Sequence, residues 1–262
     1  NENVFEPSFG LYVALATGGD LIALPTYDEK TTSAKSNTAM IQIIHNSADI
    51  LSQNVDIYVN DEMFIDNFEF RTATRFIEVP ALTDLDIKVV PQTNDMQQEL
   101  MWEQTVNFKG GESYILVANG LLSENRYDPF QPFSIYPFTG ARSAAANSNN
   151  TDVMVFHGST DAPTVDVWES GVGAGEIIND LSYGEFAGYL SLPTEDYRLQ
   201  VRDESGTDVV VEYEAPLKSL GLEGAALSVI ASGFLSPNEN VFEPSFGLYV
   251  ALATGGDLIA LP

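Results

Sequence analysis

Cysteine and long apolar runs are both missing from this chain of 262 residues. Without cysteine there is no disulfide framework, no thiolate chemistry and no cysteine-bound zinc. No apolar run approaches the roughly 18–20 residues that a membrane-spanning helix needs, so we expect no membrane insertion. Basic residues are scarce, with 11 Lys and Arg against 38 Asp and Glu and a net charge of −27. That field repels nucleic acids, which we exclude as partners, whereas it attracts divalent cations and basic surfaces.

The chain contains two related halves. Residues 41–49 resemble residues 153–161, and both stretches hold a histidine, a serine and an aspartate at alternate positions. Five further blocks match in the same order: 55–58 with 165–168, 76–80 with 189–193, 85–89 with 197–201, 114–120 with 227–233, and 133–136 with 246–249. Matched blocks in one order predict a duplicated domain.

Apolar and polar residues alternate in both halves, which predicts β-strands. Val55 and Ile57, for example, point to one face of a strand, and Asp56 to the other. Two stretches, residues 26–38 and 141–151, are rich in Ser, Thr, Ala and Asn, as linkers are. We therefore predict an all-β protein with two tandem antiparallel β-sandwich domains, of the Ig-like or transthyretin-like type, at residues 39–140 and 152–262.

A terminal segment is also duplicated, because residues 1–25 recur letter for letter as residues 238–262. Its pattern predicts a β-hairpin with a turn at Thr17–Asp20. In the second domain the segment is a closing element, whereas the N-terminal copy has no such domain before it. Since an apolar hairpin is not stable alone in water, we expect this copy to pair with a neighbouring unit. The predicted contact residues are Phe9, Leu11, Tyr12, Val13, Leu15, Leu21, Ile22 and Leu24.

Residues 157–167, His-Gly-Ser-Thr-Asp-Ala-Pro-Thr-Val-Asp-Val, resemble the signature of the bacterial domain-of-unknown-function family 4397. The first domain departs from this signature, because Asp49 is followed by Ile-Leu-Ser-Gln-Asn in place of Ala-Pro. The resemblance covers about residues 39–262 and is strongest to versions from the Bacteroidota. It implies secreted or surface-associated β-sandwich domains, often in tandem, and hence an extracellular or cell-surface location. It implies no reaction.

The repeated histidine, serine and aspartate raise the question of catalysis. A nucleophilic triad requires three converging side chains, with the base held between nucleophile and acid. Residues so close together at a strand end more naturally bind local backbone groups. We therefore predict no catalytic residues and no cofactor. A turn-stabilising role is assigned to His45, Ser47, Asp49, His157, Ser159 and Asp161.

Calcium is the metal that the sequence leaves open, because it takes oxygen ligands from carboxylates and carbonyls. The candidate ligands, none of them in an EF-hand spacing, are Asp49, Asp56, Asp61, Asp161 and Asp166. The simpler interpretation is that a soluble exterior carries these carboxylates, with Asp56 and Asp166 facing solvent from their strands. Trp102 and Trp168 are interpreted as half-buried anchors rather than as a platform for carbohydrate.

The duplicated segment favours a non-enzymatic structural protein, a unit of an extracellular fibre or surface array that joins head to tail with copies of itself. Residues 1–25 would then finish the preceding unit of a covalent array or be donated to a separate subunit, and a cloning artefact is the third explanation. The alternative function is a cell-surface adhesin or a ligand- or cation-binding module, which would use loops at the sandwich ends or an acidic face.

Overall fold

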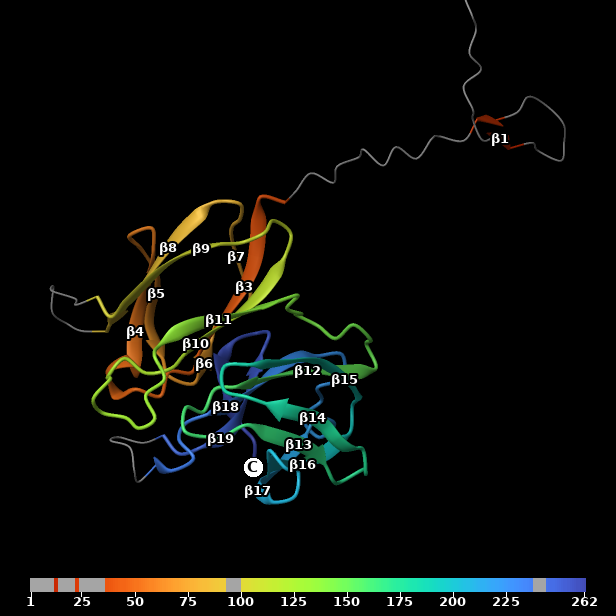
Figure 1. The fold of residues 1–262 in the computed structure, drawn as a ribbon. Coiled ribbons are helices and arrows are strands. Elements are labelled where there is room, and N and C mark those ends of the chain that lie inside the picture. Colours follow the sequence, from red (N-terminus) through yellow and green to blue (C-terminus); the bar gives the residue numbers. More distant parts are fainter. Residues whose placement is uncertain (1–11, 14–21, 24–35, 93–99, 238–243) are drawn as a thin grey trace, which may run out of the picture. The chain divides into compact units, whose positions relative to one another are not determined.

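The computed structural model describes residues 12–13, 22–23, 36–92, 100–237 and 244–262. Within them the regular structure is β-strand apart from one short 3-10 turn, η1 (Ile50–Ser52) (Figure 1). This agrees with the predicted all-β fold class. The chain divides into two units, residues 1–35 and residues 36–262.

In the first unit, β1 (Tyr12–Val13) pairs antiparallel with β2 (Ile22–Ala23), as in the predicted hairpin. Tyr12 lies opposite Ala23, and Val13 lies opposite Ile22. The other predicted contact residues lie outside the described residues, namely Phe9, Leu11, Leu15, Leu21 and Leu24.

The first sandwich is built from β3 (Thr38–His45), β4 (Asn54–Val59), β5 (Glu62–Glu69), β6 (Thr72–Ala73), β7 (Ile77–Pro80), β8 (Asp84–Pro91), β9 (Trp102–Asn107), β10 (Ser113–Asn119) and β11 (Ser134–Thr139). One sheet has the strand order β11–β10–β3–β6, with β7 also beside β3, and the other has the order β5–β4–β8–β9. Side chains at alternate positions, such as Val55 and Ile57 of β4, point into the space between these two sheets as predicted.

The second sandwich is built from β12 (Asn150–His157), β13 (Val165–Glu169), β14 (Gly175–Leu181), β15 (Phe186–Pro193), β16 (Asp196–Asp203), β17 (Val209–Pro216), β18 (Ala226–Ser232), β19 (Gly247–Leu252) and β21 (Ile259–Ala260), whereas β20 (Gly256–Asp257) joins the sheet of the first sandwich. The sheets of the second sandwich have the orders β15–β12–β18–β19–β21 and β14–β13–β16–β17. The shared strand order makes β12 the counterpart of β3, β18 that of β10, and β19 that of β11.

The central strand pair of each sandwich is parallel, which differs from the fully antiparallel arrangement predicted. β3 runs parallel to β10, and β12 runs parallel to β18. Parallel neighbours need a long crossover between them. In each domain the segment between the two parallel strands contains the strands of the opposite sheet, and this segment is the crossover.

The two sandwiches contact each other through the outer faces of the sheets that contain these parallel pairs. Ile44 and Val117 of the first domain join Phe156 and Ile230 of the second in one buried apolar cluster. Strand β3 is therefore apolar on both faces, because Ile43 enters the core of its own sandwich. A strand covered on both sides reads as a continuous hydrophobic run rather than as an alternation.

Polar contacts tie the domains further together, among them the bonds from Gln42 Nε2 to the carbonyl of Leu252 and from Arg71 Nε to Ser232 Oγ. Residues 141–149 approach the second domain closely, since Arg142 pairs with the fully buried carboxylate of Asp152 at 2.6 Å. Burial alone would raise the pKa of Asp152. Hydrogen bonds from the Ala146 N–H, Ser191 and Arg142 lower this pKa by a larger amount, so that it lies below its usual value. The strand β20 belongs to the duplicated segment yet pairs with β6 of the first domain.

Candidate functional site

The repeated His-Ser-Asp residues lie where the first strand of each domain ends. In the first domain all three are buried, with at most 1% of any of them exposed. His45 donates from Nε2 to the carbonyl of Ser52 at 2.6 Å, and its Nδ1 accepts the N–H of Ser47 at 3.3 Å. These two bonds require a neutral imidazole with its hydrogen on Nε2.

Ser47 and Asp49 reach across to the turn that follows β10. The Ser47 hydroxyl donates to the carbonyl of Gly120 at 2.6 Å. The Asp49 carboxylate accepts the N–H groups of Leu122 at 2.9 Å and Ser123 at 2.7 Å. We call this arrangement, formed by His45, Ser47 and Asp49, the turn clasp.

The second domain repeats the turn clasp with other residue numbers. His157 Nε2 donates to the carbonyl of Pro163 at 2.9 Å, and the Ser159 hydroxyl donates to the carbonyl of Gly233 at 2.7 Å. Asp161 accepts the N–H of Leu235 at 2.7 Å and that of Ser236 at 2.8 Å. Both histidines thus donate to carbonyls of the turn that follows their own strand, whereas both serines donate to carbonyls of a turn distant in the sequence.

Burial sets the protonation of both histidines. It lowers the pKa of His45 from its ordinary 6.5 to about 4, and the bond to Ser52 offsets only part of this effect. Burial also lowers the pKa of His157, although the bond to Pro163 acts to raise it. Both imidazoles are therefore neutral near pH 7.

Each clasp fixes the start of a loop, and the two loops meet. The first loop spans residues 120–133, and the second spans residues 233–246, of which 238–243 are not described. The ring of Tyr127 from the first loop stacks on that of Phe234 from the second, with centroids 5.4 Å apart and planes 7° apart. The hydroxyl of Tyr127 also accepts the N–H of Ile50 beside the first clasp. We call these two segments the paired loops.

The candidate calcium ligands are distributed over separate places. Asp49 and Asp161 belong to the two clasps. Asp61 forms an ion pair with Lys88. Among the described residues, no three or more His, Asp or Glu side chains are grouped so that they could hold a metal ion.

The expectation that Asp56 and Asp166 face solvent is wrong. Each is at most 3% exposed, because a bulge in the neighbouring strand covers its carboxylate. Asp56 accepts the N–H of Asn67, and Asp166 accepts the N–H of Asp180, both at 2.8 Å. Asn67 and Asp180 have positive φ angles of 51° and 53°, a left-handed backbone conformation that is normally unfavourable for a residue other than glycine. The hydrogen bond to each buried carboxylate stabilises this conformation.

The two tryptophans are half-buried within the described structure, as predicted. Trp102 contacts the ring of Phe133 edge-on at 5.3 Å between centroids. Trp168 lies under the guanidinium of Arg202 at 4.3 Å. Both contacts anchor the rings against their own domains.

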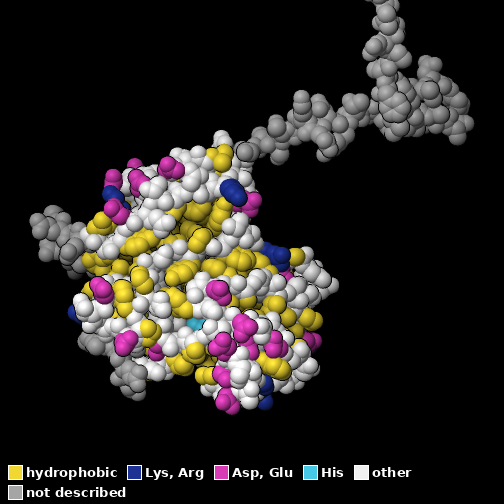
Figure 2. Space-filling model, in the orientation of Figure 1, with side chains coloured by type: hydrophobic (Ala, Val, Ile, Leu, Met, Phe, Trp, Pro, Cys, Tyr) yellow, Lys and Arg dark blue, Asp and Glu magenta, His cyan; other side chains and the backbone are white. Residues whose placement is uncertain are grey.

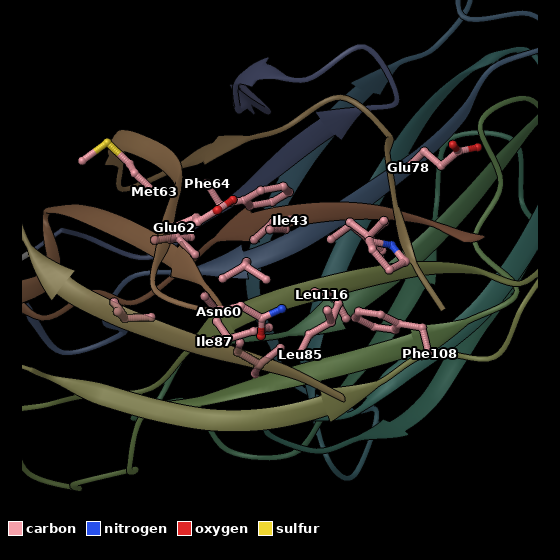
Figure 3. A pocket seen from close by; sticks show the side chains of 18 residues that line it. Ile43, Asn60, Glu62, Met63, Phe64, Glu78, Leu85, Ile87, Phe108 and Leu116 are labelled. Atoms are coloured by element: carbon pink, nitrogen blue, oxygen red, sulfur yellow. The ribbon is translucent and has the colours of Figure 1, made fainter. Parts of the chain in front are cut away.

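A cavity of about 400 Å³ lies between the two sheets of the first domain. Its walls are apolar and include Ile43, Leu85 and Leu116, and the exposed residue Glu62 lies at its rim (Figure 3). The space between the sheets of the second domain is only about 50 Å³. Sequence reasoning missed this cavity, because its walls are ordinary core residues in an ordinary strand pattern.

The fold and the clasps define a class, a two-domain β-sandwich protein whose domains repeat the same turn architecture. The model of one family, described as "Domain of unknown function (DUF4397)", matches residues 39–168 and 151–243. The chain belongs to this family. None of the helical structure in the described residues is long and apolar enough to span a membrane.

No curated protein matches the chain. The solved structures that match include one described as "Alpha-glucan binding by a streptococcal virulence factor" and another described as alpha-glucan recognition by family 41 carbohydrate-binding modules from streptococcal virulence factors. They are 10% and 11% identical to the chain, each covering 73% of it and 92% of the matched structure, with a TM-score of 0.24. Similarity at this level gives no basis for transferring a ligand.

Proposed function

We propose that this protein is a non-enzymatic binding module of the cell surface and that its paired loops form the partner-binding face. The observation that carries the proposal is the convergence of both clasps on one pair of loops. Rigid scaffolds commonly present their binding residues on loops. Here each loop is held at its start by a buried aspartate or serine, and the Tyr127–Phe234 stack joins the two loops.

The chemistry of the clasps supports a function without catalysis. A catalytic serine must have its hydroxyl free to attack and must be paired with a base. The hydroxyls of Ser47 and Ser159 instead donate to carbonyl oxygens, and each imidazole donates to a turn carbonyl. We extend the proposal to a protein that needs no cofactor and acts outside the cell.

Replacing three exposed residues of the first loop tests the binding face. We expect Glu124→Ala, Asn125→Ala and Arg126→Ala together to weaken binding about tenfold or more, because a few central contacts carry most of an interface's free energy. The measurement is saturable binding of the purified chain to an array of immobilised polysaccharides, mucins and matrix proteins.

The matched control replaces Lys109 and Glu112, which are exposed at the opposite end of β10. This variant should bind within about twofold of the unaltered chain, since substitutions outside an interface have little effect. Equal losses in the two variants, or no saturable binding to any surface of the array, would contradict the proposal.

A second candidate function, the structural unit of a fibre or surface array, is favoured by the register of the duplicated hairpin. Tyr12 pairs with Ala23 just as Tyr249 pairs with Ala260 in the identical C-terminal segment. In that segment Val250 and Leu261 are buried in the core of the second domain. The N-terminal copy therefore has the side chains of a core element, and a neighbouring copy of the chain would provide the matching surface.

Native material distinguishes the ways in which such an assembly could be joined. We expect electron microscopy to show filaments or arrays, and denaturing electrophoresis to show either very high mass, for a covalent array, or one band near the mass of a unit, for donated strands. Native protein that stays monomeric at high concentration would rule out both arrangements.

A further inference from the structure

The cavity of the first domain is a feature that its sister domain lacks. The two domains share their strand order, but the space between the sheets is about 400 Å³ in the first and about 50 Å³ in the second. The edge of the second domain is covered by β15, which has eight residues and contributes Leu190 and Leu192 to the walls. Its counterpart β7 has only four residues. The shorter strand leaves the space between the sheets open on this side.

The opening has a distinct chemical character. Figure 3 shows Glu62 on β5 beside the lined space, with Leu85, Leu116 and Phe108 lining it, whereas the side chain of Glu78 on β7 points away from it. Ile77 and Val79 of β7 face the core, so Glu78 between them faces outward. Glu62 is exposed, and the ion pairs of the described residues do not involve it. An apolar cavity with a carboxylate at its rim is complementary to a molecule with an apolar body and a positively charged end.

Size and charge together specify the ligand. A volume of about 400 Å³ is in the range of small-molecule sites in proteins, about 300–1,000 Å³. The net charge of −27 attracts cations to the whole surface and repels anions such as fatty acids. We propose that this cavity binds an amphiphilic cation, an alkyl- or arylammonium compound, with the apolar part between the sheets and the ammonium group beside Glu62. This site is separate from the paired loops.

Calorimetric titration with octylammonium, butylammonium and octanoate tests the proposal at pH 7 and low salt. We expect one octylammonium to bind per chain and octanoate to bind at least about tenfold more weakly, because it brings a negative charge to an acidic rim. Each further methylene from butyl- to octylammonium should tighten binding about fourfold, as burial of a methylene group does. Absence of octylammonium binding, or equal affinity for octanoate, would overturn the proposal.

Two sets of variants locate the site. Ala118 lines the cavity, so Ala118→Phe should fill it, abolish binding and leave the urea midpoint unchanged or raised. Val79→Phe fills the same space from β7 and serves if the first variant does not fold. Octylammonium binding that persists in a folded filled variant would show that the ligand lies elsewhere.

The rim carboxylate has its own matched control. Glu62→Gln should weaken octylammonium binding about tenfold while leaving octanol binding unaltered. Glu112→Gln removes the same charge from an exposed position that does not line the cavity, and should change binding by less than about twofold. Equal effects of the two substitutions would overturn the assignment of the rim, because only the overall charge would then matter.

Discussion

Replacing Phe156 by alanine is expected to lower the free energy of unfolding by about 3–5 kcal/mol, which is the usual cost of removing a buried phenylalanine ring. Phe156 is fully buried between the two domains. Its ring contacts those of Phe186 at 4.6 Å and Tyr136 at 5.4 Å between centroids. The substitution therefore leaves a hole where the two sheets meet. Urea denaturation at pH 7.5 measures the loss.

The shape of the unfolding curve gives a second result. If the interface makes the two domains unfold together, the unaltered chain has a single transition and Phe156→Ala separates it into two. Ile44→Val is the matched control at the equivalent position of the first domain, and its expected cost is about 0.5–1.5 kcal/mol. A loss below about 1 kcal/mol for Phe156→Ala would show that the interface contributes little to stability.

Acidification from pH 6.5 to pH 4 should destabilise the protein by about 3 kcal/mol through His45 alone. In the unfolded chain this imidazole takes up a proton near pH 6.5, whereas in the folded chain it does so only near pH 4. Between these values the unfolded state binds more protons, so stability falls as the pH falls. His157, whose pKa is lowered in the same direction, adds to the effect.

Urea midpoints at pH 7.5 and pH 5 measure this dependence before the carboxylates begin to titrate. The variant His45→Asn with His157→Asn should be less stable at pH 7.5 but should lose little further stability at pH 5. Should it fail to fold, NMR titration of the unaltered chain gives the answer, since the His45 imidazole should not take up a proton above pH 5. Titration of His45 near pH 6.5 in the folded protein would contradict the burial argument.

The sequence predicted best those features that depend on local contacts. His45 and Ser52 are seven positions apart, so a bond from the imidazole to the turn could be expected from spacing alone. The interface between the domains was not predicted, although Ile43 and Ile44 are adjacent apolar residues, as a strand with both faces covered allows.

Contacts between distant segments were harder to anticipate. Asp56 was assigned to solvent or to calcium, yet a bulge at Asn67 in the next strand buries it. Nothing in the pattern of β4 reports a bulge in β5. The pairing of Tyr127 with Phe234 joins two domains, and the cavity beside Glu62 arises from the short length of β7. Both depend on geometry that a strand pattern does not encode.

The contact between the sandwiches has an approximate two-fold character. The same face of the same sheet is used on both sides, because Ile44 and Phe156 are counterparts, as are Val117 and Ile230, and Tyr136 and Tyr249. Such a contact resembles a symmetric homodimer fused into one chain, and it closes on itself. Once two domains have bound through this patch it is buried, so it cannot bind a third domain. Growth beyond a single chain must therefore use a different, asymmetric surface.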